Sequence, residues 1–210
     1  VPAGKRIQLT FAYEGNPAAG LKIGPNKYGD RGFYSDNWSS RVRNWLPTVD
    51  HPYDKAMTEM IITAPAKYQV ASNGNIAEVS DMGEGMRRTH YKNPVPTATW
   101  LYFMGVAQMA VQQVDTYGDV PIETWVYWQD RDAGFYDFAV PSKDVLAFYS
   151  DLVGPYVNKR LANIVSTGTP GGGMEAASTP AYAPSSVTGT RSRRWQHVII
   201  HEIAHQWFGN

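Results

Sequence analysis

Alternating apolar and polar residues predict a first half built mainly from β-strands. Residues 5–13 alternate with a period of two, which is typical of a strand with one buried face. Residues 58–63 have the same character, and residues 75–92 indicate a hairpin around residues 82–85. The continuous apolar run 100–107 favours a strand that is buried on both faces.

Turn-forming residues separate these strands. Residues 14–56 are rich in Gly, Pro, Asn and Asp, so we expect loops with embedded aromatic residues there. Ser72-Asn73-Gly74 is a turn signal between two strand-like stretches.

The second half mixes strands with helices. Residues 121–128 and 161–166 predict two further strands, and a Gly-, Ser- and Pro-rich stretch follows the second one. Ser142 is a candidate N-cap of a helix with apolar residues at helical spacing. These residues are Val145, Phe148, Tyr149 and Leu152. A last helix is expected over residues 195–208.

This change of pattern predicts an α+β, multidomain chain with a boundary near residues 114–119. We expect a β domain over residues 1–116 and the first part of an α/β domain over residues 117–210.

Composition excludes several classes of partner and chemistry. The 19 basic residues balance the 19 acidic ones, so no long-range field favours nucleic acid or an anionic membrane. No stretch reaches the ~20 apolar residues of a membrane span. Because there is no Cys, disulfides, thiolate ligands and a cysteine nucleophile are excluded. The compartment and the oligomeric state stay open, with an extracellular or periplasmic location slightly preferred to the cytoplasm.

The strongest chemical signal is His201-Glu202-Ile203-Ala204-His205 in the last predicted helix. Two His residues four positions apart project from one helix face and can bind a single Zn²⁺ ion. Glu202 can then lie beside the open position of the metal and accept a proton from bound water. The alternative, a buried helix whose His residues bond to the backbone, does not explain the pair with a Glu between.

A third metal ligand must come from elsewhere. His197 continues the four-residue spacing, but eight helical residues rise ~12 Å, so His197 and His205 cannot share one ion. We expect His197 to pack in the core or behind a ligand. The metzincin pattern requires Gly at position 208, which is Phe, so that subclass is excluded.

Three segments carry a resemblance to one family. Residues 201–210, His-Glu-Ile-Ala-His-Gln-Trp-Phe-Gly-Asn, resemble the zinc-helix signature of the membrane alanyl aminopeptidase family, which includes the leukotriene-hydrolase type enzymes. Residues 172–176, Gly-Gly-Met-Glu-Ala, are similar to its Gly-x-Met-Glu-Asn motif. Residues 45–52 are similar to a Trp-Phe-Pro-Cys-x-Asp-Glu-Pro segment of its N-terminal β domain.

The resemblance implies an architecture and a set of roles. The fold would be the end of a saddle-like β-sandwich followed by the front of a thermolysin-like catalytic domain. His201 and His205 would bind zinc, Glu202 would be the general base, and Glu175 would anchor the free α-ammonium group of a peptide substrate.

The same resemblance assigns a role to the edge segment. Gly172, Gly173 and Met174 would lie along the substrate backbone, with the Gly residues allowing close approach. Taken alone, the Gly run could equally be a flexible loop. No Gly-Lys-Ser/Thr follows, so it is not expected to bind phosphate.

The chain departs from the family pattern at two positions. Ala176 stands where the family usually has Asn, so a side-chain amide that would lie near the substrate is missing. His51 replaces a Glu, a change that we expect to concern packing. The third ligand, a Glu on a later helix, and the transition-state Tyr would lie beyond Asn210. We therefore expect a truncated piece of a longer enzyme, inactive by itself.

Three functions from different classes remain. The leading hypothesis is a zinc-dependent aminopeptidase that acts on peptides with a free N-terminus. The second is another zinc hydrolase, such as an epoxide hydrolase or an endopeptidase. The third is a non-catalytic relative that only binds peptide termini.

Overall fold

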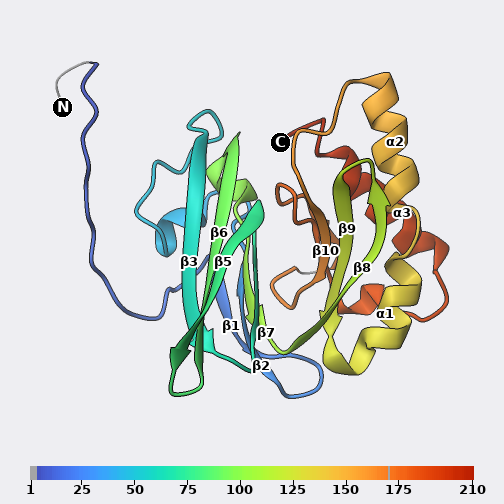
Figure 1. The fold of residues 1–210 in the computed structure, drawn as a ribbon, viewed down its shortest axis with the longest axis horizontal. Coiled ribbons are helices and arrows are strands. Elements are labelled where there is room, and N and C mark those ends of the chain that lie inside the picture. The colour runs from blue at the N-terminus through green and yellow to red at the C-terminus, as the bar shows by residue number, and fades with distance from the viewer. Residues whose placement is uncertain (1–3, 170) are drawn as a thin grey trace.

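The computed structural model describes residues 4–169 and 171–210, which form mostly β-sheet with few helices. Two sheets come from the first half of the chain (Figure 1). One has the order β1-β2-β7-β4, with bounds Leu21–Pro25, Arg31–Ser35, Met104–Ala107 and Gln69–Ser72. The other has the order β3-β6-β5, with bounds Ala56–Pro65, Met86–Thr97 and Asn75–Gly83.

The predicted hairpin around residues 82–85 is confirmed as the β5–β6 connection. Gly83, Glu84 and Gly85 have φ angles of 75°, 52° and 72°. A run of left-handed residues matches the right-handed twist of the two strands, and Gly adopts it without a steric penalty. The local sequence thus determines this turn.

The predicted turn at Asn73 and Gly74 is also present, between β4 and β5. A Cβ atom on Gly74 would lie 2.1 Å from the Lys92 carbonyl oxygen, and its φ is +75°, so only Gly fits this position.

The third sheet comes from the second half and is mixed. Its order is β11-β12-β10-β9-β8, with bounds Gly173–Met174, Ala181–Tyr182, Leu161–Val165, Val120–Tyr127 and Met109–Tyr117. β10 is parallel to both β9 and β12, whereas β8 and β11 are antiparallel to their neighbours. The predicted strands 121–128 and 161–166 are therefore confirmed, and β11 lies at one edge of the sheet.

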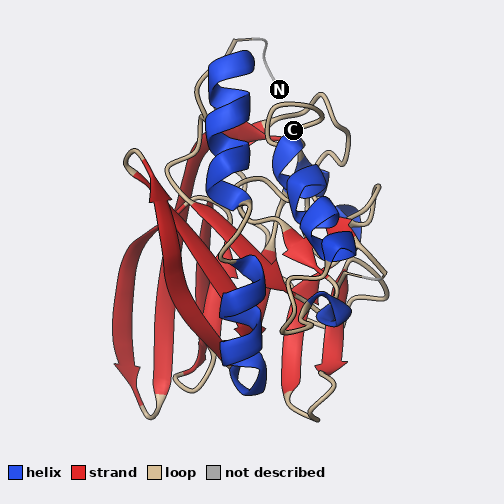
Figure 2. Ribbon diagram, turned by 90° about the vertical axis from the view of Figure 1, so that its right-hand side faces the viewer, coloured by secondary structure: helices blue, strands red, loops and turns tan. Residues whose placement is uncertain are grey.

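Helices cover one face of this mixed sheet, as the view from the helix side shows (Figure 2). They are α1 (Arg131–Phe138), α2 (Ser142–Leu152) and α3 (Arg193–Ala204). Short 3-10 helices lie at Val42–Asn44, Thr99–Leu101, Trp128–Asp130 and Pro184–Ser186. In α3, the buried residues Trp195, Ile199 and Ile203 recur every four positions and form the face that packs inward.

Buried side chains join the sheets. One cluster lies between the two sheets of the first half and contains Ala64, Tyr68, Val70, Tyr91 and Val106. The larger cluster includes residues from both halves, among them Tyr34, Phe103, Trp125, Ile164 and Ile199. The two halves of the chain therefore share a hydrophobic core.

The N-terminal strand prediction is wrong. Residues 5–13 are extended but pair with no strand among the described residues, and Figure 1 shows this stretch apart from the sheets. The apolar residues of the alternating pattern are 48–68% exposed. Alternation gives a segment one apolar and one polar face. To form a strand of a sheet, the segment must also hydrogen bond to the edge of another strand about 5 Å away. The expected loops at 14–56 instead contain β1 and β2.

Other boundaries also differ from expectation. The apolar run 100–107 is divided between a 3-10 helix and β7, and α1 was not expected. Pro141, not Ser142, is the N-cap of α2, and the Ser142 hydroxyl instead accepts a hydrogen bond from the Asn163 amide at 2.9 Å. The last helix ends at Ala204, and His205 is its C-cap.

The expected domain division at 116/117 falls inside β8, which pairs along its length with β9. Within residues 4–169 and 171–210, no helix combines the length and apolar character needed to cross a membrane.

Candidate metal centre

His201, Glu202 and His205 come together at the C-terminal end of α3. Their potential ligand atoms all lie within 4.8 Å of one another. The Nε2 atoms of the two imidazoles face each other at 3.2 Å. Two nitrogen ligands ~2.0–2.1 Å from one tetrahedral zinc ion would be about 3.3 Å apart. The residues present therefore fit two positions of a zinc site.

The backbone after α3 orients the second imidazole. His205 Nδ1 lies 2.8 Å from the Phe208 carbonyl oxygen, which can only accept a hydrogen bond. His205 is then the tautomer whose Nε2 keeps a free lone pair, as a metal ligand requires. This contact needs the chain to leave the helix at His205, so the early end of α3 contributes to the site.

The Glu202 side chain lies beside the two imidazoles and is buried against β11, in a dry environment. The side chain is 5% exposed and packs against β11, where a Cβ atom on Gly173 would lie 2.2 Å from the Glu202 Oε1. Burial and, to a smaller extent, the nearby Glu175 carboxylate raise the pKa of Glu202 to about 8. A cation at the two imidazoles would favour the charged form and lower this pKa.

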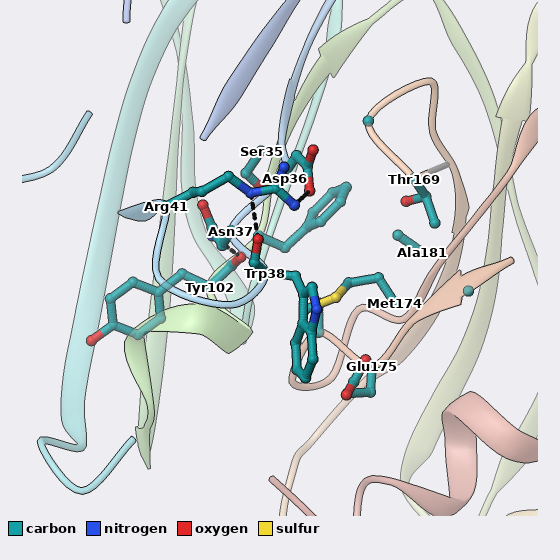
Figure 3. A pocket seen from close by; sticks show the side chains of 14 residues that line it. Ser35, Asp36, Asn37, Trp38, Arg41, Tyr102, Thr169, Met174, Glu175 and Ala181 are labelled. Atoms are coloured by element: carbon teal, nitrogen blue, oxygen red, sulfur yellow. Dashed lines mark hydrogen bonds and ion pairs between the residues drawn. The ribbon is translucent and has the colours of Figure 1, made fainter. Parts of the chain in front are cut away.

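Glu175 follows directly after the edge strand β11 and is half-buried. Its carboxylate has no hydrogen-bond or ion-pair partner among the described residues. With Met174 and Trp38 it lines a cavity of about 230 Å³ between the first half of the chain and β11 (Figure 3). An unpaired carboxylate in a cavity can bind a cationic group.

The other acid of this cavity is already neutralised. Asp36 lies 3.2 Å from Lys22 Nζ and 2.8 Å from Arg41 Nη2, so two cations balance its charge. Glu175 is therefore the free negative charge among the described residues of the cavity wall.

The structure brings most of the predicted site residues together. His201, Glu202, His205, Gly173 and Glu175 lie around the contact between α3 and β11.

The remaining predictions have mixed outcomes. The Gly172 carbonyl accepts a hydrogen bond from Ala183 N at 2.9 Å, which ties it to the neighbouring strand. His197 is exposed, so the expectation of a core residue is wrong. Ala176 is 1% exposed.

Sequence patterns did not reveal the residues that connect these parts. Gln206, Asn210 and Asn73 all hydrogen bond to the segment that contains Glu175. Gln206 and Asn210 lie inside the zinc-helix signature, which is the one sequence signal that points to them, whereas the sequence around Asn73 predicts only a turn.

Comparison with protein-family models identifies peptidase domains in both halves. The Peptidase M1 N-terminal domain matches residues 2–101, and the Peptidase family M1 domain matches residues 137–210. The two matches occur in chain order and agree with the zinc-helix resemblance. The chain therefore belongs to peptidase family M1.

Several curated proteins are similar to the chain. Glutamyl aminopeptidase from Homo sapiens is 25% identical over 185 residues, which cover 84% of this chain and 19% of that protein. Leukotriene A-4 hydrolase from Xenopus laevis is 28% identical over 182 residues, covering 84% of this chain and 28% of that protein. Probable aminopeptidase 2 from Sulfurisphaera tokodaii is 27% identical over 179 residues, which cover 82% of this chain and 22% of that protein. The chain thus spans 19–28% of the length of these relatives.

Proposed function

We propose that this chain is the front part of a zinc-dependent aminopeptidase. The observation that carries the proposal is the 3.2 Å approach of the His201 and His205 Nε2 atoms beside the Glu202 side chain. Family membership and the aminopeptidase names of several relatives support the same class of reaction.

His201 and His205 would hold the ion, with a third ligand supplied by a part of the protein outside this chain. A zinc ion bound there would supply a Lewis acid that polarises a peptide carbonyl and increases the acidity of water. Glu202, held against β11, would accept the proton of the attacking water. The 210 residues alone supply two ligands, so we expect them to have no peptidase activity by themselves.

Glu175 would select substrates with a free amino terminus. A peptide α-ammonium group makes a charge-assisted hydrogen bond with a carboxylate, and this carboxylate has no other described partner. Gly172, Gly173 and Met174 would run beside the substrate backbone, and the exposed edge of β11 supports this role. The neighbouring cavity, with Trp38 and Met174 in its wall, would receive the first side chain.

We also propose an architecture for each half of the chain. The cluster between the first two sheets supports a β-sandwich, and the mixed sheet with helices on one face supports a thermolysin-like start of the catalytic domain. We propose two domains. Because β8 pairs along its length with β9, we propose that they divide at Gln108, a few residues before the expected 116/117.

An epoxide hydrolase is the second candidate, because leukotriene A-4 hydrolase is among the similar proteins. The free Glu175 carboxylate favours a substrate with an ammonium group. Hydrolysis of free-amine peptides in preference to epoxides would support the first candidate.

The test uses the full-length protein and Glu202→Gln. The wild type should contain stoichiometric zinc, and the variant should retain it while losing about 10²–10⁴-fold in turnover, because the base is removed without a ligand. Glu84→Gln, at the exposed tip of the β5–β6 hairpin, is a matched control that should keep wild-type turnover. Turnover retained by Glu202→Gln, or wild-type protein without zinc, would contradict the assignment.

A further inference from the structure

Gln206 connects the end of α3 to the segment that carries Glu175. It is 8% exposed, and its Oε1 accepts a hydrogen bond from Ser178 N at 2.9 Å. Its Nε2 lies 3.4 Å from two carbonyl oxygens, those of Glu175 and Glu202. The Gln206 side-chain oxygen therefore meets a hydrogen-bond donor, and its nitrogen meets two acceptors.

Asn210 adds a second connection to the same point. Its Nδ2 donates to the Glu175 carbonyl oxygen at 2.9 Å. The Glu175 carbonyl thus receives two amide donors from the chain that follows His205, while no other element among the described residues donates a side-chain hydrogen bond to it.

The opposite side of this segment is fixed by the first half of the chain. Asn73 Nδ2 donates to the Ala177 carbonyl at 2.6 Å, and Gly74 N donates to the Ser178 hydroxyl at 2.9 Å. Ser178 has φ of +60°, a conformation that requires such outside support in a non-Gly residue. Contacts from the first half of the chain therefore help to position this segment.

An aminopeptidase needs a defined distance between the ammonium anchor and the atoms that cleave the bond. Misplacement by ~1 Å can cost on the order of 10²-fold in rate. Gln206 is the residue after His205 and lies four positions after Glu202, so it moves with both. Its hydrogen bonds transmit the position of these residues directly to the backbone of Glu175.

Building on the proposed function, we propose that Gln206, assisted by Asn210, is a positioning residue that sets the distance between the Glu175 anchor and the metal and base. Its side-chain hydrogen bonds go to the backbone of Ser178, Glu175 and Glu202, so it would act through them. Its role is to make cleavage depend on a free amine one residue from the scissile bond.

The experiment compares Gln206→Met with Gln196→Met in the full-length protein. Met keeps the length of Gln but forms none of its hydrogen bonds. Gln196 is the matched control, because it lies near the N-terminal end of α3, away from the site. Its side chain donates one hydrogen bond of 2.8 Å to the carbonyl oxygen of Asp137 in α1. For each protein, kcat and KM are measured on a dipeptide amide with a free amine and on its N-acetylated form, together with zinc content and amide exchange of residues 173–179.

Gln206→Met should keep its zinc, exchange the Ser178 amide faster, and lose at least tenfold in the ratio of kcat/KM for the free over the acetylated substrate. Gln196→Met should keep the wild-type ratio, since a general loss of stability lowers both activities together. Asn210→Leu, which removes only a donor to Glu175, should lower the ratio in the same direction and remains informative if Gln206→Met does not fold.

A wild-type ratio in Gln206→Met and Asn210→Leu would overturn the positioning role and leave the aminopeptidase proposal intact. Loss of zinc from Gln206→Met would also overturn it, because Gln206 would then act through the metal ligands. A wild-type protein with no preference for the free amine would overturn the proposed function and this inference with it.

Discussion

Helix α3 and the segment 172–179 lie against each other, yet they are held in different ways. Most backbone hydrogen bonds of α3 stay within the helix, and one face of buried residues, Trp195, Ile199 and Ile203, fixes its orientation. The segment 172–179 has only the two strand residues of β11. Its other polar groups bond to side chains and backbone from distant parts of the chain, including Asn73, Leu101 and Gln206.

This difference predicts how each part of the site responds to substitution. The spacing of His201 and His205 follows from one helical turn, closed by the hydrogen bond of 3.2 Å from His205 N to the His201 carbonyl, so it depends mainly on local structure. The place of Glu175 depends on several long-range contacts acting together. We therefore expect the metal pair to tolerate distant substitutions that disturb the anchor.

The largest effect is expected where the two regions touch. In Gly173→Val the new Cβ would lie 2.2 Å from Glu202 Oε1 and 2.3 Å from its Cγ, so Glu202 or β11 must move. Turnover should fall by on the order of 10²-fold or more while zinc is retained. Gly24→Val, with nothing within 4 Å of its Cβ position, is the matched control. Normal turnover in Gly173→Val would show that the close approach of β11 to the Glu202 side chain is not needed for catalysis.

A smaller effect is expected from the anchor itself. Glu175→Ala should lower kcat/KM for free-amine peptides by about 10- to 100-fold and leave N-acetylated peptides nearly unaffected, because a hydrogen bond to a charged group contributes about 1.5–3 kcal/mol. Asp36→Asn, in the same cavity but paired with Lys22 and Arg41, should change this ratio less. Equal losses on both substrates for Glu175→Ala would argue against an ammonium anchor.

The smallest effect on chemistry should come from Asn73, whose contribution is mainly to stability. Its side chain is 3% exposed and bonds to Leu101, Ala177, Thr179 and Phe103. Asn73→Ala should lower the free energy of unfolding by about 2–3 kcal/mol, because buried partners lose their hydrogen bonds. Urea unfolding measures this loss. Asn44→Ala, an exposed residue with one side-chain hydrogen bond, should cost less than about 0.5 kcal/mol.

Local signals predicted the elements that carry them. The β5–β6 hairpin, β9, β10, α2 and α3 all appear near their expected positions, because their turns and apolar periods lie within a few residues. Residues 5–13 have the same kind of alternation and form no strand. Whether an alternating segment becomes a strand depends on a partner edge, which no local pattern encodes.

The sequence by itself determined the pairing of the two imidazoles, since a four-residue spacing on a helix places His201 and His205 on one face. It also indicated Glu202 and, through the family resemblance, Glu175. Only the tertiary structure decided that Gly173 lies against Glu202, that Asp36 is neutralised while Glu175 is free, and that Gln206 joins the two regions. The Gly173–Glu202 contact and the Gln206–Ser178 hydrogen bond join residues 29 and 28 positions apart, where chain connectivity fixes neither distance nor direction and packing does so.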